Sequence, residues 1–372
     1  MWDHRYLRRI DLRTIPLLLA LMLISLLVIS STSGSEDSFW TKLSKSQLEW
    51  FAFGWVVYLF FAGLDYRKFR SWTWVLYGII LLMLVGLFFT SPIQNVHRWY
   101  KLPLLGRAFQ PSEYAKLVVV IALSWFMEHK GNRVGTLSSA FQALLIVFVP
   151  FALILKQPDL GTAMVLFPIA LVMFYFGGVH RRVVRIMSFL ALGGIAFMVM
   201  MFSGFLSHEQ MRPYMTKFLK EYQYERLNPH TYHQRAAQTA IALGGVKGSG
   251  WHQSEFTGRD WLPEPSTDSV FAAYAEEFGL IGVFLLLLFF FALLYCSFQV
   301  TAVARDPFGR LLSAGIAVYL AMHVIVNIGM MCGMLPITGV PLVLVTYGGS
   351  SVLSTMMALG ILQSIYSRRF TF

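Results

Sequence analysis

The chain has 372 residues, of which 56% are hydrophobic and only 13% are charged, and its formal net charge is +11. Its mean hydropathy is +0.60. These values exclude a soluble globular protein, and continuous apolar runs of about 20 residues favour membrane-spanning helices over the short alternating strands of an outer-membrane barrel.

The apolar runs predict an all-α polytopic membrane protein with about ten transmembrane helices, because in lipid a helix bonds each backbone group within its own segment. We expect one integral membrane domain over residues 1–372. In chain order the expected spans are about 14–30, 48–64, 72–90, 112–128, 138–155, 161–177, 183–203, 268–299, 308–331 and 341–366.

The Lys and Arg residues of the short loops predict the orientation, since basic residues collect on the cytoplasmic side. Placing the N-terminus inside gives the cytoplasm most of them, including those from Arg5 to Arg13. An even number of spans then puts both termini inside. The positive charge therefore reflects topology and does not indicate nucleic acid binding. Cys296 and Cys332 have no His or Cys partner at ligand spacing, so neither a disulfide nor a metal site is expected from them.

A long segment between spans seven and eight, about 204–267, is expected outside the cytoplasm and folded. The pattern over 213–222 predicts an amphipathic helix on the membrane surface, opened by Pro213. Thr231 and Gln234 form a capping-box signature for a second helix, which Gly244 and Gly245 would end. The next residues, GGVKGSGW, lack the GK[ST] ending of a phosphate loop, which favours a tight turn.

Polar motifs from four connections fall on the expected outer face. Irregular backbone at membrane depth is tolerated where it lines a cavity, so these motifs suggest the rim of one polar cavity. The residues are Arg98, Arg107, Glu113 and Lys116 after span three; Asp159 after span five; Arg226, Lys247 and Asp268 after span seven; and Gly339, Tyr347, Gly348, Gly349 and Ser350 after span nine.

Several of these acids have a structural alternative that the sequence leaves open. Asp159 follows a proline and precedes a span, so it could cap that helix or belong to the site. Glu113 and Lys116 are three residues apart on one helix face and could form an ion pair. Glu276 and Glu277 lie deeper than the outer surface, and for both we favour bonding to neighbouring helices.

Asp268 is the acid at the water-facing start of span eight. Ser266-Thr267-Asp268 after two prolines is a good helix start, and a carboxylate there would be stabilised by the helix N-terminus, which lowers its pKa. A general base must be ionised but not too weak, so burial or a nearby Glu would have to oppose that field. A helix cap and a catalytic or transport acid both remain open.

Nucleotides are not supplied outside the cytoplasmic membrane, and no phosphate loop is evident in the sequence. An enzyme on this face would therefore take activated substrates already attached to lipid, such as a polyprenyl-diphosphate sugar. Its diphosphate would need cations or a divalent metal, Mg or Mn, held partly by the phosphates. The candidate cations are Arg98, Arg107, Lys116, Arg226 and Lys247.

Five segments together closely resemble the SEDS family (shape, elongation, division and sporulation). They extend from span three to the end of the chain. Their residues resemble the family members that serve elongation more than those that serve division. The sequence departs from the family at Pro265 and Ser266, where relatives usually carry a basic residue and a histidine. The segments are RWYKLPLLGRAFQPSEYAKL, KQPDLGTAMVL, AIALGGVKGSGW, LPEPSTDSVFAAYAEEFGLIG and VNIGMMCGMLPITGVPLVLVTYGGSS.

The resemblance implies a peptidoglycan glycosyltransferase in the bacterial cytoplasmic membrane. It would polymerise lipid II during cell elongation, together with a class B penicillin-binding protein, the elongation machinery and membrane lipids. Asp268 would carry over as the essential acid, and Glu113, Lys116, Asp159 and Arg226 as functional positions. Two other functions stay open. A lipid II flippase would need a polar path to both faces, and a non-catalytic scaffold would keep its function in cells without Asp268.

Overall fold

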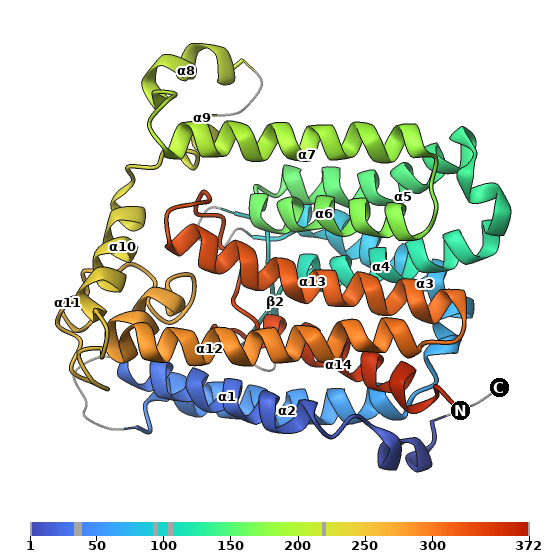
Figure 1. The fold of residues 1–372 in the computed structure, drawn as a ribbon, viewed down its shortest axis with the longest axis horizontal. Coiled ribbons are helices and arrows are strands. Elements are labelled where there is room, and N and C mark those ends of the chain that lie inside the picture. The colour runs from blue at the N-terminus through green and yellow to red at the C-terminus, as the bar shows by residue number, and fades with distance from the viewer. Residues whose placement is uncertain (1, 33–38, 92–95, 103–106, 218–220, 371–372) are drawn as a thin grey trace.

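The computed structural model describes residues 2–32, 39–91, 96–102, 107–217 and 221–370. Within this part the chain is mostly helical, and its long helices run side by side along the longest axis of the molecule (Figure 1). They are α1 (Thr14–Ser31), α2 (Lys42–Gly63), α3 (Phe69–Gly86), α4 (Pro111–Lys130), α5 (Leu137–Lys156), α6 (Leu160–Phe176), α7 (Arg181–Phe202), α12 (Val270–Val303), α13 (Pro307–Met331) and α14 (Gly349–Ser367).

Six helical segments of the described residues are long and apolar enough to cross a membrane, and α6 is a shorter apolar helix. The chain is thus a multi-pass membrane protein. The six segments are Thr14–Ser31, Tyr66–Phe89, Leu137–Lys156, Arg181–Phe202, Val270–Val303 and Pro307–Met331. Pro307–Met331 is the central one, with 78% of its most apolar window buried, whereas Arg181–Phe202 lies at the edge of the bundle with 6% buried.

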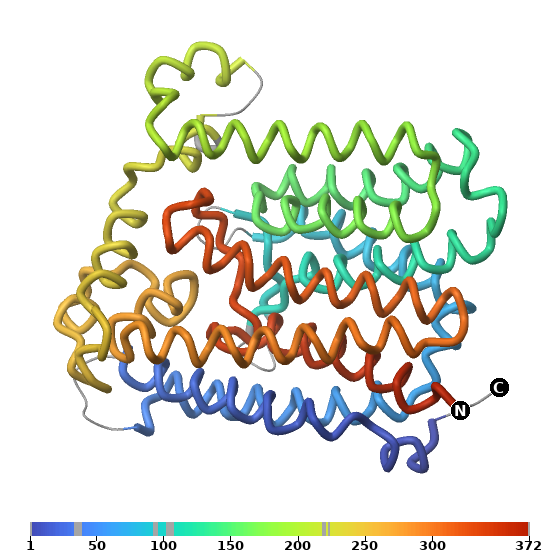
Figure 2. The backbone as a smooth tube through the Cα atoms, viewed as in Figure 1, coloured from blue at the N-terminus to red at the C-terminus, as the bar shows by residue number. Residues whose placement is uncertain are grey.

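The short elements gather away from the chain termini. They are α8 (His208–Met215), α9 (Glu221–Glu225), α10 (Tyr232–Gly244), α11 (Glu255–Gly258) and an antiparallel pair of strands, β1 (Tyr100–Leu102) and β2 (Arg107–Phe109). The backbone trace shows both ends of the described chain at one end of the bundle and α10 and α11 at the other (Figure 2). Short 3₁₀ turns, His4–Arg9, Tyr66–Lys68, Leu87–Phe89 and Gly131–Gly135, flank the long helices.

The expected helix limits agree with the structure to within four residues except at three places, of which the first is α2, which begins at Lys42 and not near 48. The last long helix begins at Gly349 and not near 341, because the preceding residues form an irregular segment in which the Thr346 hydroxyl accepts a hydrogen bond from the Leu342 amide. The single helix expected over 213–222 is also wrong. Helix α8 contains Pro213 and ends at Met215, and residues 218–220 of the expected helix lie outside the described part.

The second helix expected between residues 204 and 267 is confirmed as α10. Thr231 accepts the capping hydrogen bond from the Gln234 amide, and Gly245 ends the helix with a positive φ of 51°. The capping box is not reciprocal, however. The Gln234 side chain donates instead to the carbonyls of Met330 and Leu335, and so fastens α10 to the end of α13.

The glycine-rich turn after α10 is confirmed, and it fits into a break in α12. Gly279 has φ 60° and ψ −165°, which interrupts the helix and frees backbone groups on both sides. The turn satisfies them. The amides of Ser249 and Gly250 donate to the backbone carbonyls of Glu276 and Glu277, and the amides of Leu280 and Ile281 donate to the carbonyls of Gly245 and Val246. The two glycines Gly248 and Gly279 touch so closely that a Cβ on either would collide with the other's backbone.

Candidate active site

A pocket of about 380 Å³ opens between α10, the residues before α12 and the connection from α13 to α14. It has both acidic and basic walls. We call it the Asp268 pocket, and its lining residues are Arg98, Glu225, Arg226, Thr231, His233, Glu264, Asp268, Ile337, Thr338 and Gly339.

Hydrogen bonds hold the backbone carbonyls of Asp268 and of the two residues before it. The Tyr347 amide donates to the Ser266 carbonyl at 2.9 Å, and the Thr346 hydroxyl donates to the Thr267 carbonyl at 3.3 Å. Asn327 of α13 donates through Nδ2 to the Asp268 carbonyl at 3.2 Å. Three consecutive carbonyls are therefore fixed. Asp268 itself lines the pocket.

Asp268 does not cap α12, so the helix-start interpretation is wrong. The residue before the first helical turn is Ser269, and its side chain makes no capping hydrogen bond. The chain instead forms a turn on Glu264, whose φ is 49° and whose carbonyl accepts from the Thr267 and Ser269 amides. The Asp268 carboxylate lies against Gly339, since a Cβ on that glycine would be 3.4 Å from Oδ2.

The pKa of Asp268 is raised to about 6, so the opposing effect that a general base at this position needs is present. Burial is the largest cause, and the negative charge of Glu264 adds to it. The positive charges of Arg226 and Arg98 oppose this rise without cancelling it, and Asp159 adds a smaller upward effect. A carboxyl group with this pKa is mostly ionised at neutral pH and still basic enough to accept a proton.

Of the five candidate cations, the structure brings Arg98 and Arg226 to the Asp268 pocket. Arg98 is fixed by donating to the carbonyls of Gln157 and Pro158 at the end of α5. Lys247 lies in the exposed turn beside the break in α12 and does not line this pocket. Arg107 begins β2, but its side chain lies outside the described part of the structure.

Lys116 is the fifth candidate cation, and it lies inside the bundle, with 1% of its surface exposed. Its Nζ donates to Glu113 Oε1 at 2.8 Å, which confirms the ion pair. The same Nζ lies 2.7 Å from Nε2 of His323 on α13. Neither Glu113 nor Lys116 lines the Asp268 pocket, so direct contact with a substrate there is not what their present geometry provides.

Asp159 is confirmed as the cap of α6. Its Oδ1 accepts from the Thr162 amide, and its Oδ2 accepts from the side chains of Gln110, Ser112 and Thr162. With all these partners and only 4% exposure, the carboxylate joins the starts of α4 and α6 and does not line the pocket.

The two deeper acids of α12 differ from each other. Glu276 caps the short helix α11, since its carboxylate accepts from the Phe256 amide and from the amide and hydroxyl of Thr257. Glu276 thus bonds the short helix α11 and not a neighbouring long helix. Glu277 is 2% exposed, and neither of its carboxylate oxygens has a hydrogen-bond partner among the described residues.

The residues from Tyr347 to Ser350 anchor the start of α14 and do not line the Asp268 pocket. The Tyr347 hydroxyl donates to Ser46, and the Gly348 amide donates to Gln47, both on α2. Ser350 accepts from the Gln110 amide at 3.1 Å. The expectation of one rim formed by all four connections is thus met only in part.

Five of the ten pocket residues were not identified from the sequence, namely Glu225, His233, Glu264, Ile337 and Thr338, and His233 and Glu264 are the two that influence Asp268 or its neighbour most directly. His233 follows the α10 cap by two residues, and its Nε2 lies 2.7 Å from the Ser269 hydroxyl. Burial lowers the pKa of His233, whereas Glu264 acts in the opposite direction. Glu264 stands four residues before Asp268 in the PEPSTD motif, and that proximity was the one available signal.

The acids of the pocket do not form a protein-built metal centre. No group of three His, Cys, Asp or Glu side chains suited to one metal ion occurs in the described residues. The carboxylates that line the pocket are those of Asp268, Glu264 and Glu225. The described residues of this pocket therefore do not fit a resident metal with three protein ligands.

Comparisons with known proteins cover nearly the whole chain. A family described as "Cell cycle protein", with FtsW, RodA and SpoVE as its members, matches residues 10–370. Peptidoglycan glycosyltransferase MrdB of Escherichia coli K12 is 32% identical over 99% of this chain and 95% of its own. Stage V sporulation protein E of Bacillus subtilis is 33% identical over 96% of this chain and 98% of its own. A solved chain from "a peptidoglycan synthase complex" aligns with a TM-score of 0.78 at 27% identity, covering 98% of this chain and 99% of that one.

Proposed function

The chain belongs to the FtsW, RodA and SpoVE family, the SEDS family, and from this premise we propose that it is a peptidoglycan glycosyltransferase that polymerises lipid II during cell elongation. The observation that carries the proposal is the Asp268 carboxylate, whose pKa is about 6, in a pocket with Arg98 and Arg226. The names of the relatives and the solved complex support the same reaction class.

Asp268 acts as the general base in this proposal. It accepts the proton of the acceptor's GlcNAc 4-hydroxyl while that oxygen attacks the anomeric carbon of the donor's MurNAc. The bond from this carbon to the diphosphate breaks with inversion, and undecaprenyl diphosphate leaves. Arg98 and Arg226 stabilise the negative charge that develops on the leaving diphosphate. A divalent cation, Mg or Mn, enters only as a companion of the substrate diphosphate.

The ten long helices all cross the cytoplasmic membrane in the arrangement that we propose. Both termini are cytoplasmic, and the segment from about 204 to 267 is outside. The position of both chain ends opposite α10 and α11 supports this orientation (Figure 1). The Asp268 pocket, which α10 helps to line, then opens at the outer surface, where lipid II presents its disaccharide.

The partner that we propose is a class B penicillin-binding protein, which crosslinks the new strands within the elongation machinery. The support is the solved relative, since that structure concerns the coordination of polymerization and crosslinking. Membrane lipids surround the remaining apolar surface.

The test is polymerisation of fluorescent lipid II by the purified protein with its partner transpeptidase, with the glycan strands separated on a gel. Asp268→Asn keeps the shape of the side chain and removes the base, so we expect a loss of polymer by at least 100-fold. Asp260→Asn is the matched control, because Asp260 is exposed on the same outer segment and its φ of 57° suits Asn. Full polymerisation by Asp268→Asn would remove the base assignment.

A further inference from the structure

Helix α13 connects the buried ion pair of α4 to the wall of the Asp268 pocket. Tyr319, His323 and Asn327 are four residues apart on one face of α13, and all three are buried. His323 meets Lys116 of α4 on one side. Its other ring nitrogen, Nδ1, lies 3.0 Å from the Pro341 carbonyl, in the segment that faces Asp268.

The chemistry of these contacts fixes the tautomer of His323. A carbonyl oxygen only accepts, so Nδ1 must carry a proton and donate to Pro341. An ammonium group only donates, so Nε2 must be the acceptor for Lys116. His323 is thus neutral, and both of its ring nitrogens are hydrogen-bonded. The Lys116 ammonium also donates to Glu113. We call Glu113, Lys116, His323 and the Pro341 carbonyl the polar chain.

Asn327 lies one helical turn beyond His323 and bonds to the main chain on both sides of the pocket wall. Its Nδ2 donates to the Val340 carbonyl at 2.8 Å and to the Asp268 carbonyl at 3.2 Å. One amide group thereby ties the main chain of Asp268 to the segment that begins with Gly339. Gly339 lines the pocket beside Asp268, since a Cβ on it would be 3.4 Å from the carboxylate, and its φ of 75° favours glycine at this position.

We propose that His323 and Asn327 are positioning residues for Asp268, and that Lys116 and Glu113 act on the reaction through them without touching the substrate. This rests on the proposed function, in which Asp268 is the base. The polar chain and Asn327 fix Val340 and Pro341, and these residues fix the wall against which the Asp268 carboxylate lies. A displacement of that carboxylate by about 1 Å would slow proton transfer by up to about 100-fold.

Two substitutions of His323 test its hydrogen bonds to Lys116 and to Pro341 separately. In His323→Asn the side-chain amide can replace Nδ1 and still donate to Pro341, but it cannot reach Lys116. In His323→Gln the amide oxygen can replace Nε2 as the acceptor for Lys116, but the donor to Pro341 is lost. Asn327→Leu removes both hydrogen bonds of the amide group and keeps the number and branching of the side-chain heavy atoms. Ile325→Ala is the control, because Ile325 is an exposed residue of the same helix.

The experiment measures kcat and KM for lipid II in the reconstituted complex, and amide hydrogen exchange over residues 339–347 in the same samples. We expect His323→Gln and Asn327→Leu to lower kcat by 10- to 100-fold with KM changed less than about twofold, and to speed exchange in this segment. His323→Asn keeps the donor to Pro341 but loses the contact with Lys116, so it should lower kcat by about 3- to 10-fold, between wild type and His323→Gln. Ile325→Ala should change neither quantity.

Three results would overturn the proposal. Unchanged kcat in the folded variants would leave a purely structural role, and a raised KM at constant kcat would place these residues in substrate binding. Equal exchange in all variants would show that they do not hold the 339–347 segment. If the wild-type protein makes no polymer, the proposed function fails, and the exchange data still decide whether His323 and Asn327 hold the wall of the pocket.

Discussion

The Asp268 carboxylate makes the pocket chemically useful and makes the fold less stable. Its pKa is about 6 in the folded protein against an ordinary value of 3.8, because burial and Glu264 disfavour the charged form. A carboxyl with a raised folded pKa binds more protons when folded than when unfolded between these two values. The raised pKa therefore does not change the free energy of unfolding below about pH 4, and it lowers that free energy by its full amount above about pH 6.

Asp268→Asn should consequently stabilise the protein while it abolishes catalysis. Above pH 7 the neutral amide avoids the cost of a buried charge, which is at most about 3 kcal/mol. Thermal unfolding in detergent should give a higher Tm for the variant at pH 7.5 and equal values at pH 4. A lower Tm at pH 7.5 would mean that the carboxylate makes stabilising contacts as an ion. Asp260→Asn serves again as the control.

At the residue scale, the sequence predicted contacts between neighbours in the chain better than contacts across the fold. The cap at Asp159 and the pair of Glu113 and Lys116 depend on residues three positions apart, and both are confirmed. The hydrogen bonds that hold the carbonyls of residues 266–268 come from Asn327, Thr346 and Tyr347, each at least 59 positions away from its partner. No local pattern indicates such contacts, so the cap expected for Asp268 was wrong and His233 was missed.

At the element scale, the break in α12 is the feature most sensitive to a single methyl group. Gly279 has backbone angles that are open almost only to glycine, at a cost of about 1–3 kcal/mol for other residues. A Cβ there would also collide with the backbone at Gly248. We expect Gly279→Ala to separate the turn from α12 and to lower Tm markedly, with faster hydrogen exchange at Ser249 and Gly250.

Gly193→Ala provides the contrast for that substitution. Gly193 lies in the outermost long helix, α7, and a Cβ there would have no neighbour within 4 Å. Alanine should leave Tm unchanged or raise it slightly, since it is the better helix former. Equal effects of the two substitutions would contradict the role assigned to the break.

The helices themselves were predictable because apolar runs of membrane length leave the chain little other choice. What the apolar pattern could not show is where such a run stops being helical. Residues 341–348 are as apolar as a helix, yet Leu344 has a positive φ of 58° and the Thr346 hydroxyl binds the Leu342 amide. The break at Gly279 was likewise hidden, because the residues on both sides of it belong to one expected helix and α12 continues across it for 34 residues in all.

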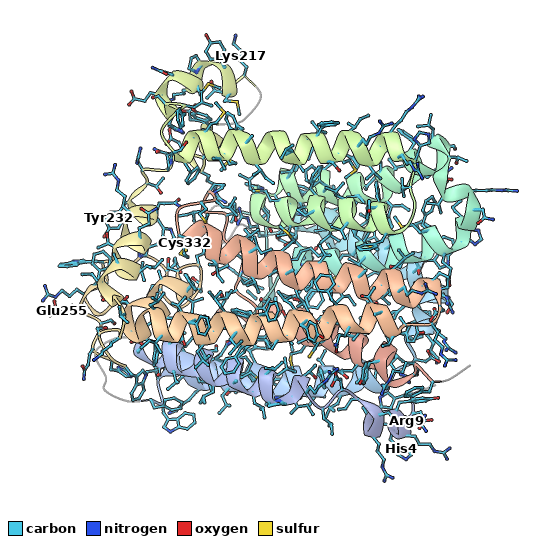
Figure 3. All side chains as sticks on the ribbon, in the orientation of Figure 1. His4, Arg9, Lys217, Tyr232, Glu255 and Cys332 are labelled. Atoms are coloured by element: carbon cyan, nitrogen blue, oxygen red, sulfur yellow. The ribbon has the colours of Figure 1, made fainter. Side chains whose placement is uncertain are left out.

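At the scale of the whole molecule, the two native cysteines allow the proposed orientation to be tested. Cys332 follows α13 and is exposed, at the same end as Tyr232 and Glu255 and opposite His4 and Arg9 (Figure 3). Cys296 is buried within α12. A pocket that opens outward requires Cys332 to be accessible from outside the cytoplasmic membrane.

A membrane-impermeant maleimide should therefore label intact spheroplasts at Cys332. Because burial raises the pKa of this thiol, its reactive thiolate form increases with pH, and labelling should be faster at pH 8.5 than at pH 7. Cys332→Ser should abolish the signal, since Cys296 is buried. In that background, Asn132→Cys at the exposed connection after α4 should react only after permeabilisation. The reverse pattern would place the Asp268 pocket in the cytoplasm, where it could not polymerise lipid II on the outer face.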